Sequence, residues 1–387
     1  MRGLALTVIL GLLLPVSGVA SVAVPNPFPE TLPLPVEARN PVVLNARLDL
    51  EMRRAGGPRR HIVEQLLLDG RTDDAFWSMK VTRACLAWVV DCARFLPLVE
   101  QMPEHLSGDA RKSVEYDAGL LRREAYVQAM SANQRRDVYL RALEGFPIGD
   151  PQVSWLDADT AALRALEEGH DDLIPAIRRV LNGRLKANRE PIEMHLRVRE
   201  ASISRRAGDT LLRLVQEGVG WDVERLLAQP PMWNMDRLLA ESKRPKAGAR
   251  QDESPLGVAR LALDELRRVN PPGASEGLRE VLTLYKPAEE KRRRDREEFL
   301  AKEKRIEAKG GQAVALHVPR EKALDGRLSR DIVEAIGDLG DRDFERAVFK
   351  DLLGGRLTLW DRVNKVEQEL VKQGKMKASE MVSGEQQ

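Results

Sequence analysis

Residues 209–229, "DTLLRLVQEGVGWDVERLLAQ", decide the fold class of this chain. Apolar side chains recur there three and four positions apart, as at Leu211, Leu214 and Val215, so they share one face of an α-helix. The same spacing recurs in shorter segments upstream, and each of these ends at a glycine, a proline or a charged turn. The pattern predicts an all-α protein made of short amphipathic helices.

The composition agrees with this prediction. Leu, Ala, Arg and Glu, which favour helices, dominate the 387 residues, and an apolar fraction of 43% is typical of globular proteins. The 62 basic and 60 acidic residues leave a net charge of +2. A nucleic-acid-binding protein normally has a clustered basic surplus, so no nucleic-acid partner is expected.

The cadence of helix and turn over residues 44–229 resembles that of HEAT-type repeats, whose hairpins span about 40 residues. No consensus recurs at a fixed period, and a non-repetitive bundle therefore remains an alternative. We predict stacked short helical hairpins, in a HEAT-like solenoid or an irregular helical bundle. A long charged helix and a C-terminal helical hairpin would complete the fold.

The first 23 residues have the pattern of a signal peptide. Arg2 precedes an apolar run over residues 4–14, Pro15 ends that run, and small residues follow at 18–20 and 21–23. We therefore expect cleavage and export to the periplasm or the medium. The alternative is an uncleaved segment, residues 4–24, that anchors the protein in the membrane facing outward, since no charge lies between Arg2 and Glu30.

Changes in composition divide the rest of the chain into segments. Six prolines between residues 25 and 41 predict an extended spacer. The predicted segments are the spacer at 24–43, a helical-hairpin domain at 44–242, a linker with connecting helices at 243–285, a charged exposed helix at 286–311 and a C-terminal helical segment at 312–387. Residues 312–319, "QAVALHVP", are the best candidate for a strand.

Residues 286–311, "KPAEEKRRRDREEFLAKEKRIEAKGG", mix charges of both signs. Glu289 precedes Arg293 by four residues, a spacing that supports a helix. A helix that is polar nearly all round is typical of an exposed spacer. The basic patch Arg292, Arg293 and Arg294 is a candidate contact for an acidic partner, although nearby carboxylates would weaken binding to phosphates.

The two cysteines, Cys85 and Cys92, lie within "CLAWVVDC". On a continuous helix they would sit two turns apart, roughly 10 Å along the axis, whereas a disulfide needs Cα atoms within about 7 Å. We predict that both are buried without a bond; a break in the helix would instead permit one. No histidine or further cysteine lies at ligand spacing, so no metal or cofactor is expected.

Signatures of catalysis are sparse. The five histidines are scattered, and no GxSxG, Walker or GxGxxG loop occurs. Residues 337–345, "GDLGDRDFE", place carboxylates beside glycines but lack the spacing of a calcium loop.

Residues 238–263, "LLAESKRPKAGARQDESPLGVARLAL", resemble the Glu-Ser motif of lytic transglycosylases, which are helical exported enzymes that cleave peptidoglycan. The resemblance implies that Glu241 protonates the glycosidic oxygen and that residues 254–257 form the loop that follows. This chain has a longer loop, and residues 260–263 stand where that family has Gly-Leu-Met-Gln.

Residues 230–235, "PPMWNM", offer a partner contact through Pro231, Met232, Trp233 and Met235, or a plug between two helices. Taken together, the sequence favours an exported, non-enzymatic helical scaffold that binds a protein or a cell-envelope component. The alternatives are a peptidoglycan-acting enzyme that uses Glu241 and an exported chaperone or assembly factor whose charged helix joins two lobes.

Overall fold

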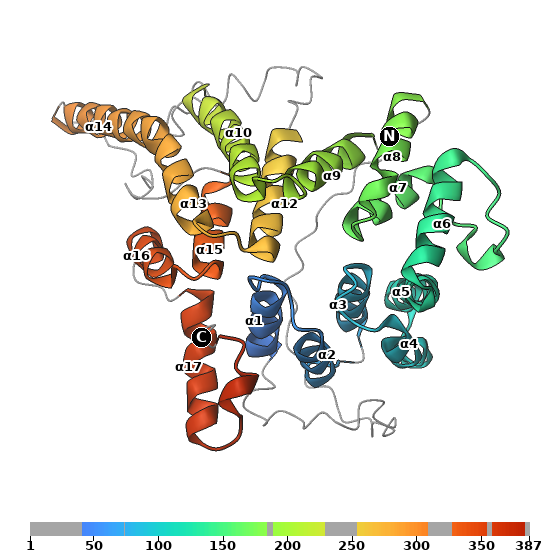
Figure 1. The fold of residues 1–387 in the computed structure, drawn as a ribbon. Coiled ribbons are helices and arrows are strands. Elements are labelled where there is room, and N and C mark those ends of the chain that lie inside the picture. Colours follow the sequence, from blue (N-terminus) through green and yellow to red (C-terminus); the bar gives the residue numbers. More distant parts are fainter. Residues whose placement is uncertain are drawn as a thin grey trace. The chain divides into compact units, whose positions relative to one another are not determined.

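The computed structural model describes residues 41–72, 74–183, 189–228, 254–308, 327–353 and 358–383, and residues 33–387 form one compact unit (Figure 1). Every regular element in these ranges is helical, and no strand occurs among them, so the all-α prediction is confirmed. The predicted segment boundaries stay predictions. The signal peptide, most of the proline-rich spacer and the candidate strand at 312–319 lie outside the described residues.

The first helices differ from the prediction at the two cysteines. They are α1 (Pro41–Met52), α2 (Arg60–Asp69), α3 (Ala75–Leu86), α4 (Cys92–Glu100) and α5 (Gly108–Ala129). Cys85 and Cys92 are both fully buried, as expected, but they form a disulfide with Cα atoms 5.4 Å apart. The prediction of two unbonded thiols is therefore wrong, because α3 ends at Leu86 and the chain turns through Trp88, whose φ is +57°, before α4 begins.

The second group of helices encloses a Leu/Ala-rich core. It comprises α6 (Ala132–Glu144), α7 (Ala158–Glu167), α8 (Ile174–Gly183) and α9 (Arg189–Ser202). The side chain of Asp157 caps α7 by accepting from the amide of Thr160. Small residues such as Ala161 and Ala165 are fully buried, which allows α6 and α7 to pack closely.

The third group centres on α10 (Ala207–Ala228) and α12 (Ser254–Val269), which make an extensive contact. Gly218 permits it, since a Cβ there would lie 2.5 Å from the Ala259 Cβ and 2.8 Å from the Pro255 carbonyl oxygen. The same apolar core includes side chains of α13 (Ala274–Leu282), α15 (Ser329–Asp338) and α16 (Arg342–Leu353). The last two form the predicted C-terminal hairpin.

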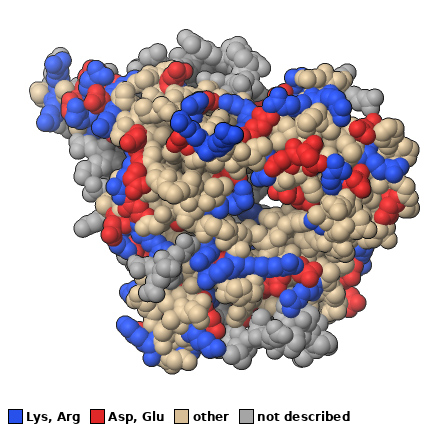
Figure 2. Space-filling model, viewed as in Figure 1, with Lys and Arg blue, Asp and Glu red and all other residues tan. Residues whose placement is uncertain are grey.

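The predicted charged helix is α14 (Lys286–Ala308), which extends away from α13 with acidic and basic side chains interspersed (Figures 1 and 2). None of its described side chains is buried, and the Lys291 Nζ lies 2.8 Å from Asp295 Oδ2 one turn on. The helices before and after it in sequence, α13 and α15, pack against each other. The chaperone hypothesis, in which this helix joins two lobes, stays a prediction.

The final helix, α17 (Leu359–Lys372), returns to the first. Thr358 caps it by accepting from the Asp361 amide. Leu44 and Leu50 of α1 share an apolar cluster with Trp360 and Val363 of α17. An open stack of hairpins would keep its first and last helices apart, whereas here they are in contact.

Candidate functional site

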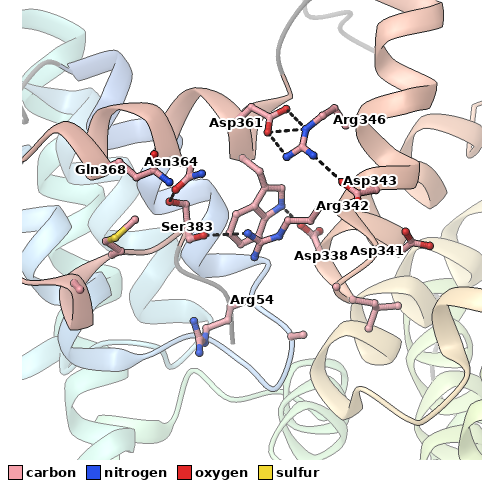
Figure 3. Close-up of a pocket in the computed structure, with 16 residues that line it drawn as sticks. Arg54, Asp338, Asp341, Arg342, Asp343, Arg346, Asp361, Asn364, Gln368 and Ser383 are labelled. Atoms are coloured by element: carbon pink, nitrogen blue, oxygen red, sulfur yellow. Dashed lines mark hydrogen bonds and ion pairs between the residues drawn. The ribbon is translucent and has the colours of Figure 1, made fainter. Parts of the chain in front are cut away.

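The candidate site is a pocket of about 940 Å³ where four parts of the chain meet. They are the turn between α15 and α16, the outer face of α17, and the loop after α1 together with the C-terminal segment at 378–383. The residues that define it are Arg54, Asp338, Arg342, Arg346, Trp360 and Asp361 (Figure 3). Most of these side chains are charged, so the pocket is suited to a polar ligand rather than an apolar one.

An aromatic side chain lies at the base of the pocket. Trp360 is 4% exposed, and its Nε1 donates to Asp338 Oδ1 at 3.0 Å. The guanidinium of Arg342 lies 3.8 Å from the centre of the indole ring, a cation–π arrangement, and its Nη1 donates to the Ser383 carbonyl oxygen at 3.0 Å (Figure 3). Arg342 therefore connects the turn before α16 with α17 and the C-terminal segment.

Asp338 is the centre of a buried charge cluster. It accepts from Arg267 Nε at 2.9 Å, and Arg53 Nε lies 3.7 Å away. Arg53 also forms an ion pair with Glu334. Burial raises the pKa of Asp338, and the two arginines oppose that rise. The cluster joins the turn after α1 to α12 and α15.

Glu345 lies beside this cluster, but its burial is not offset by hydrogen bonds to both carboxylate oxygens. It is 1% exposed, and its Oε2 has no hydrogen-bond partner in the described structure. Burial and the neighbouring Asp338 raise the pKa of Glu345 to about 8, against the attraction of Arg53. The carboxyl group is therefore mostly protonated at pH 7. Glu345 packs directly over Gly337, since a Cβ there would lie 2.1 Å from Glu345 Oε2 and the carboxyl group would have to move.

The rim of the pocket is a second set of paired charges. Arg346 donates to Asp361 Oδ1 through Nη2 at 2.7 Å and through Nε at 3.0 Å. Although burial opposes the effect, hydrogen bonds from Arg346 and Thr358 lower the pKa of Asp361. Arg279 forms an ion pair with Asp341 on the other side. Because these charges are balanced locally, they hold a fixed pattern of donors and acceptors at the surface.

A second polar network lies at the end of α3 and is more enclosed. The indole of Trp88 donates to Glu124 Oε2 at 3.1 Å, and Glu124 also pairs with Arg164. Arg135 stacks 4.7 Å from the centre of the Trp88 ring and donates to Glu168 Oε2 at 2.8 Å. These contacts tie the disulfide loop to α5, α6 and α7, which is a structural role.

The structure does not bring the residues proposed from sequence to this pocket. Glu241 and the contact residues Pro231, Met232, Trp233 and Met235 lie outside the described residues. Arg292, Arg293 and Arg294 are on α14, with the last two exposed, and none of them lines the pocket.

Sequence reasoning missed the pocket itself. One signal for it was available, since residues 337–345 contain Asp338, Arg342 and Glu345. Their density of charge around two glycines was tested only against calcium-loop spacing. Their partners on α1, α12 and α17 could not be identified from spacing along the chain.

Comparisons of the whole chain with models of protein families, with curated proteins and with solved structures each gave no match. Within the described ranges, no group of three or more acidic, histidine or cysteine side chains is arranged to hold a metal ion. No helix in those ranges combines the length and the apolar character needed to cross a bilayer. Function is therefore inferred from the residues of the pocket and its surroundings.

Proposed function

We propose that this protein is an exported, non-enzymatic helical scaffold that binds a protein or a cell-envelope partner. The observation that carries the proposal is the pairing of charges in the pocket. Asp338, Asp341 and Asp361 each have an arginine partner. Paired charges of this kind suit recognition, where a surface must present the same groups in every encounter, better than proton transfer.

The disulfide supports the proposed export of the protein. Disulfides persist in oxidising compartments such as the periplasm and the extracellular space. A bond between Cys85 and Cys92 agrees with the export expected from residues 1–23. The alternative localisation is the membrane, where residues 4–24 would remain uncleaved and act as an anchor.

For the finer architecture we propose an irregular bundle of helical hairpins in place of a regular solenoid. Neighbouring helices in sequence, such as α4 and α5 or α6 and α7, pack as pairs. The contact between α1 and α17 favours a bundle whose ends meet. Such an arrangement offers a partner a fixed surface composed of several helices.

Export is tested by measuring the mass of the protein in each cell fraction of an expressing bacterium. A mature chain that begins at Ser21 or Val24 in the periplasm or the medium is expected. An intact chain in the membrane would establish the anchored alternative. An intact chain in the cytoplasm would contradict export in either form.

The binding role is tested by site-specific photo-crosslinking in the exporting cell. A photo-reactive residue at Gln368, on the pocket rim, should give one discrete adduct, whereas the same residue at Lys112, exposed on α5, should give none. Equal labelling at both positions, or at neither, would contradict a partner at this pocket.

The enzyme hypothesis is tested separately with purified peptidoglycan. The scaffold proposal expects no release of soluble glycan fragments by the purified protein and no effect of Glu241→Gln. Release that is lost in a folded Glu241→Gln protein would replace the scaffold proposal with a glycan-cleaving enzyme.

A further inference from the structure

The C-terminal segment at 376–383 follows α17 and packs against side chains of α1 and α17, and the surface that it covers is called the groove here. The chain reverses at Gly374, whose φ is +66°, and forms a short helical turn at Ala378–Glu380. Met381 is then extended, with φ −66° and ψ 128°. Val382 and Ser383 then form a bend, which turns both of their amides toward α17.

A single buried carboxylate binds two successive amides of this segment. Glu367, which is fully buried, accepts from the Val382 N–H at 3.0 Å and from the Ser383 N–H at 2.9 Å. The Ser383 hydroxyl donates to the same carboxylate at 2.5 Å. The charge of Glu367 is balanced by Arg47, whose Nε lies 2.8 Å away.

Arginines from three different places bind the carbonyl oxygens of the segment. Arg47 Nη2 donates to the Glu380 oxygen at 3.3 Å, and Arg59 Nη2 donates to the Met381 oxygen at 3.4 Å. Arg342 reaches the Ser383 oxygen from the pocket side. All of these are main-chain contacts, so the groove would bind other sequences with the same backbone path.

Two further features of the groove bear on which peptides it would bind: the apolar surroundings of Val382 and a donor on Arg47. Val382 is 1% exposed and packs with α1 and α17, so the groove prefers an apolar side chain at that position. Arg47 is 3% exposed and keeps its Nη1 without a hydrogen-bond partner in the described structure. A buried, charged donor without a partner beside a bound peptide segment indicates a site whose hydrogen-bonding capacity this occupant does not fill.

We propose that this groove is a peptide-binding site, filled in the free protein by its own C-terminal segment and taken over by a segment of a protein partner that adopts the same bend. That segment would carry an apolar residue where Val382 lies, followed by a small hydroxyl residue, and would continue into the pocket beside Arg342. The inference rests on the proposed scaffold function and names the site and the chemistry of the partner.

The first test uses a fluorescent, C-terminally amidated peptide of sequence "MKASEMVS", residues 376–383. A chain truncated after Lys375 should bind it saturably in fluorescence anisotropy. The full chain should bind it at least tenfold more weakly, because its own segment competes at high effective concentration. Equal affinity for both chains, or no binding to the folded truncated chain, would overturn the proposal.

N-methylated peptides distinguish recognition of the main chain from nonspecific binding. Methylation of the Ser383 amide nitrogen removes a donor to Glu367 and should weaken binding at least tenfold. Methylation at Ser379, whose amide lies outside the contacts to Glu367, should change affinity less than twofold. Equal losses from both methylations would contradict the assigned contacts.

The full chain provides a test that does not require the truncated chain to fold. If the segment detaches by itself, the amides of Val382 and Ser383 should exchange with deuterium at least tenfold faster than that of Val363 in α17. Equal rates would mean that the segment opens only with global unfolding, which would overturn the proposal. A doubled mass that truncation abolishes would identify the occupant as a second copy and overturn the partner assignment.

These outcomes separate the two proposals. Peptide binding in vitro without a crosslinked partner in the cell would keep the groove and remove the scaffold function. A partner adduct at Gln368 without peptide binding would keep the scaffold and remove the groove.

Discussion

Two helix contacts differ in the kind of side chain that forms them. One joins α10 to α12, and the other joins α1 to α17. The first is made of apolar side chains around Gly218 and Ala259, at a distance that leaves no room for a further methyl group. The second has an apolar part but encloses the ion pair of Arg47 and Glu367, both almost fully buried. Apolar packing contributes most of the stability of such contacts. A buried ion pair contributes less, but a helix pairing that left either charge without its counter-ion would be strongly destabilised.

The two regions also differ in how they treat a buried carboxylate. Asp222 of α10 accepts from the Tyr285 hydroxyl at 2.8 Å and the Leu328 amide at 3.3 Å, and it pairs with Arg225. Glu345, beside the α1–α17 contact, keeps an oxygen without a partner and has a raised pKa. The two carboxylates therefore differ in their surroundings, since Asp222 has two hydrogen-bond donors and an arginine, whereas one oxygen of Glu345 has no partner in the described structure.

The largest effect is expected from Glu367→Ala. It leaves Arg47 buried without its counter-ion and removes the acceptor for two amides, so the free energy of unfolding should fall by about 3–5 kcal/mol. Urea denaturation measures the change. Glu369→Ala, an exposed neighbour on the same helix, should stay within about 0.5 kcal/mol. A similar loss in both variants would mean that the ion pair does not define this contact.

The apolar contact can be probed with two glycines of the same helix. Gly218→Ala should destabilise the protein by about 1–3 kcal/mol, because the new methyl group would overlap Ala259 and the Pro255 carbonyl. Gly220→Ala should stabilise it by up to about 1 kcal/mol, because no atom lies within 4 Å of that Cβ and alanine favours a helix. Thermal melts compare the two, and equal shifts would contradict the close approach of α10 and α12.

The effect of Glu345→Gln on stability should change with pH. The pKa of Glu345 is about 8 in the folded chain, against 4.5 for a solvated glutamate in an unfolded chain, so the folded state holds the extra proton between these limits. Wild-type stability should therefore fall by about 1.4 kcal/mol per pH unit as pH rises through that window, relative to Glu345→Gln. Above pH 8 the difference should level off.

Urea denaturation at several pH values measures this difference. Asp343→Asn serves as the control, since Asp343 lies on the same helix with its side chain 95% exposed. Its stability relative to wild type should not change over the same window. Parallel pH profiles for wild type and Glu345→Gln would show that Glu345 is already ionised at neutral pH.

Features that depend on neighbours along the chain can be predicted from the amino-acid sequence. Apolar spacing in α10 predicts a helix because residues three and four apart share a face. Thr358 caps α17 and Asp157 caps α7 through amides three residues on, within reach whatever the rest of the chain does. The charged helix α14 likewise follows from local charge pairs and the near absence of an apolar face.

Contacts between residues that are distant in sequence could be identified only from the folded structure. Arg47 and Glu367 are 320 residues apart, and no local pattern marks them as partners. The disulfide depended on where α3 ends, and the prediction failed because a continuous helix was assumed through Cys85 and Cys92. The pKa of Glu345 depends on burial and on Asp338 and Arg53, which are contributed by other helices. Spacing along the chain fixes local geometry, whereas burial and pairing are properties of the packed molecule.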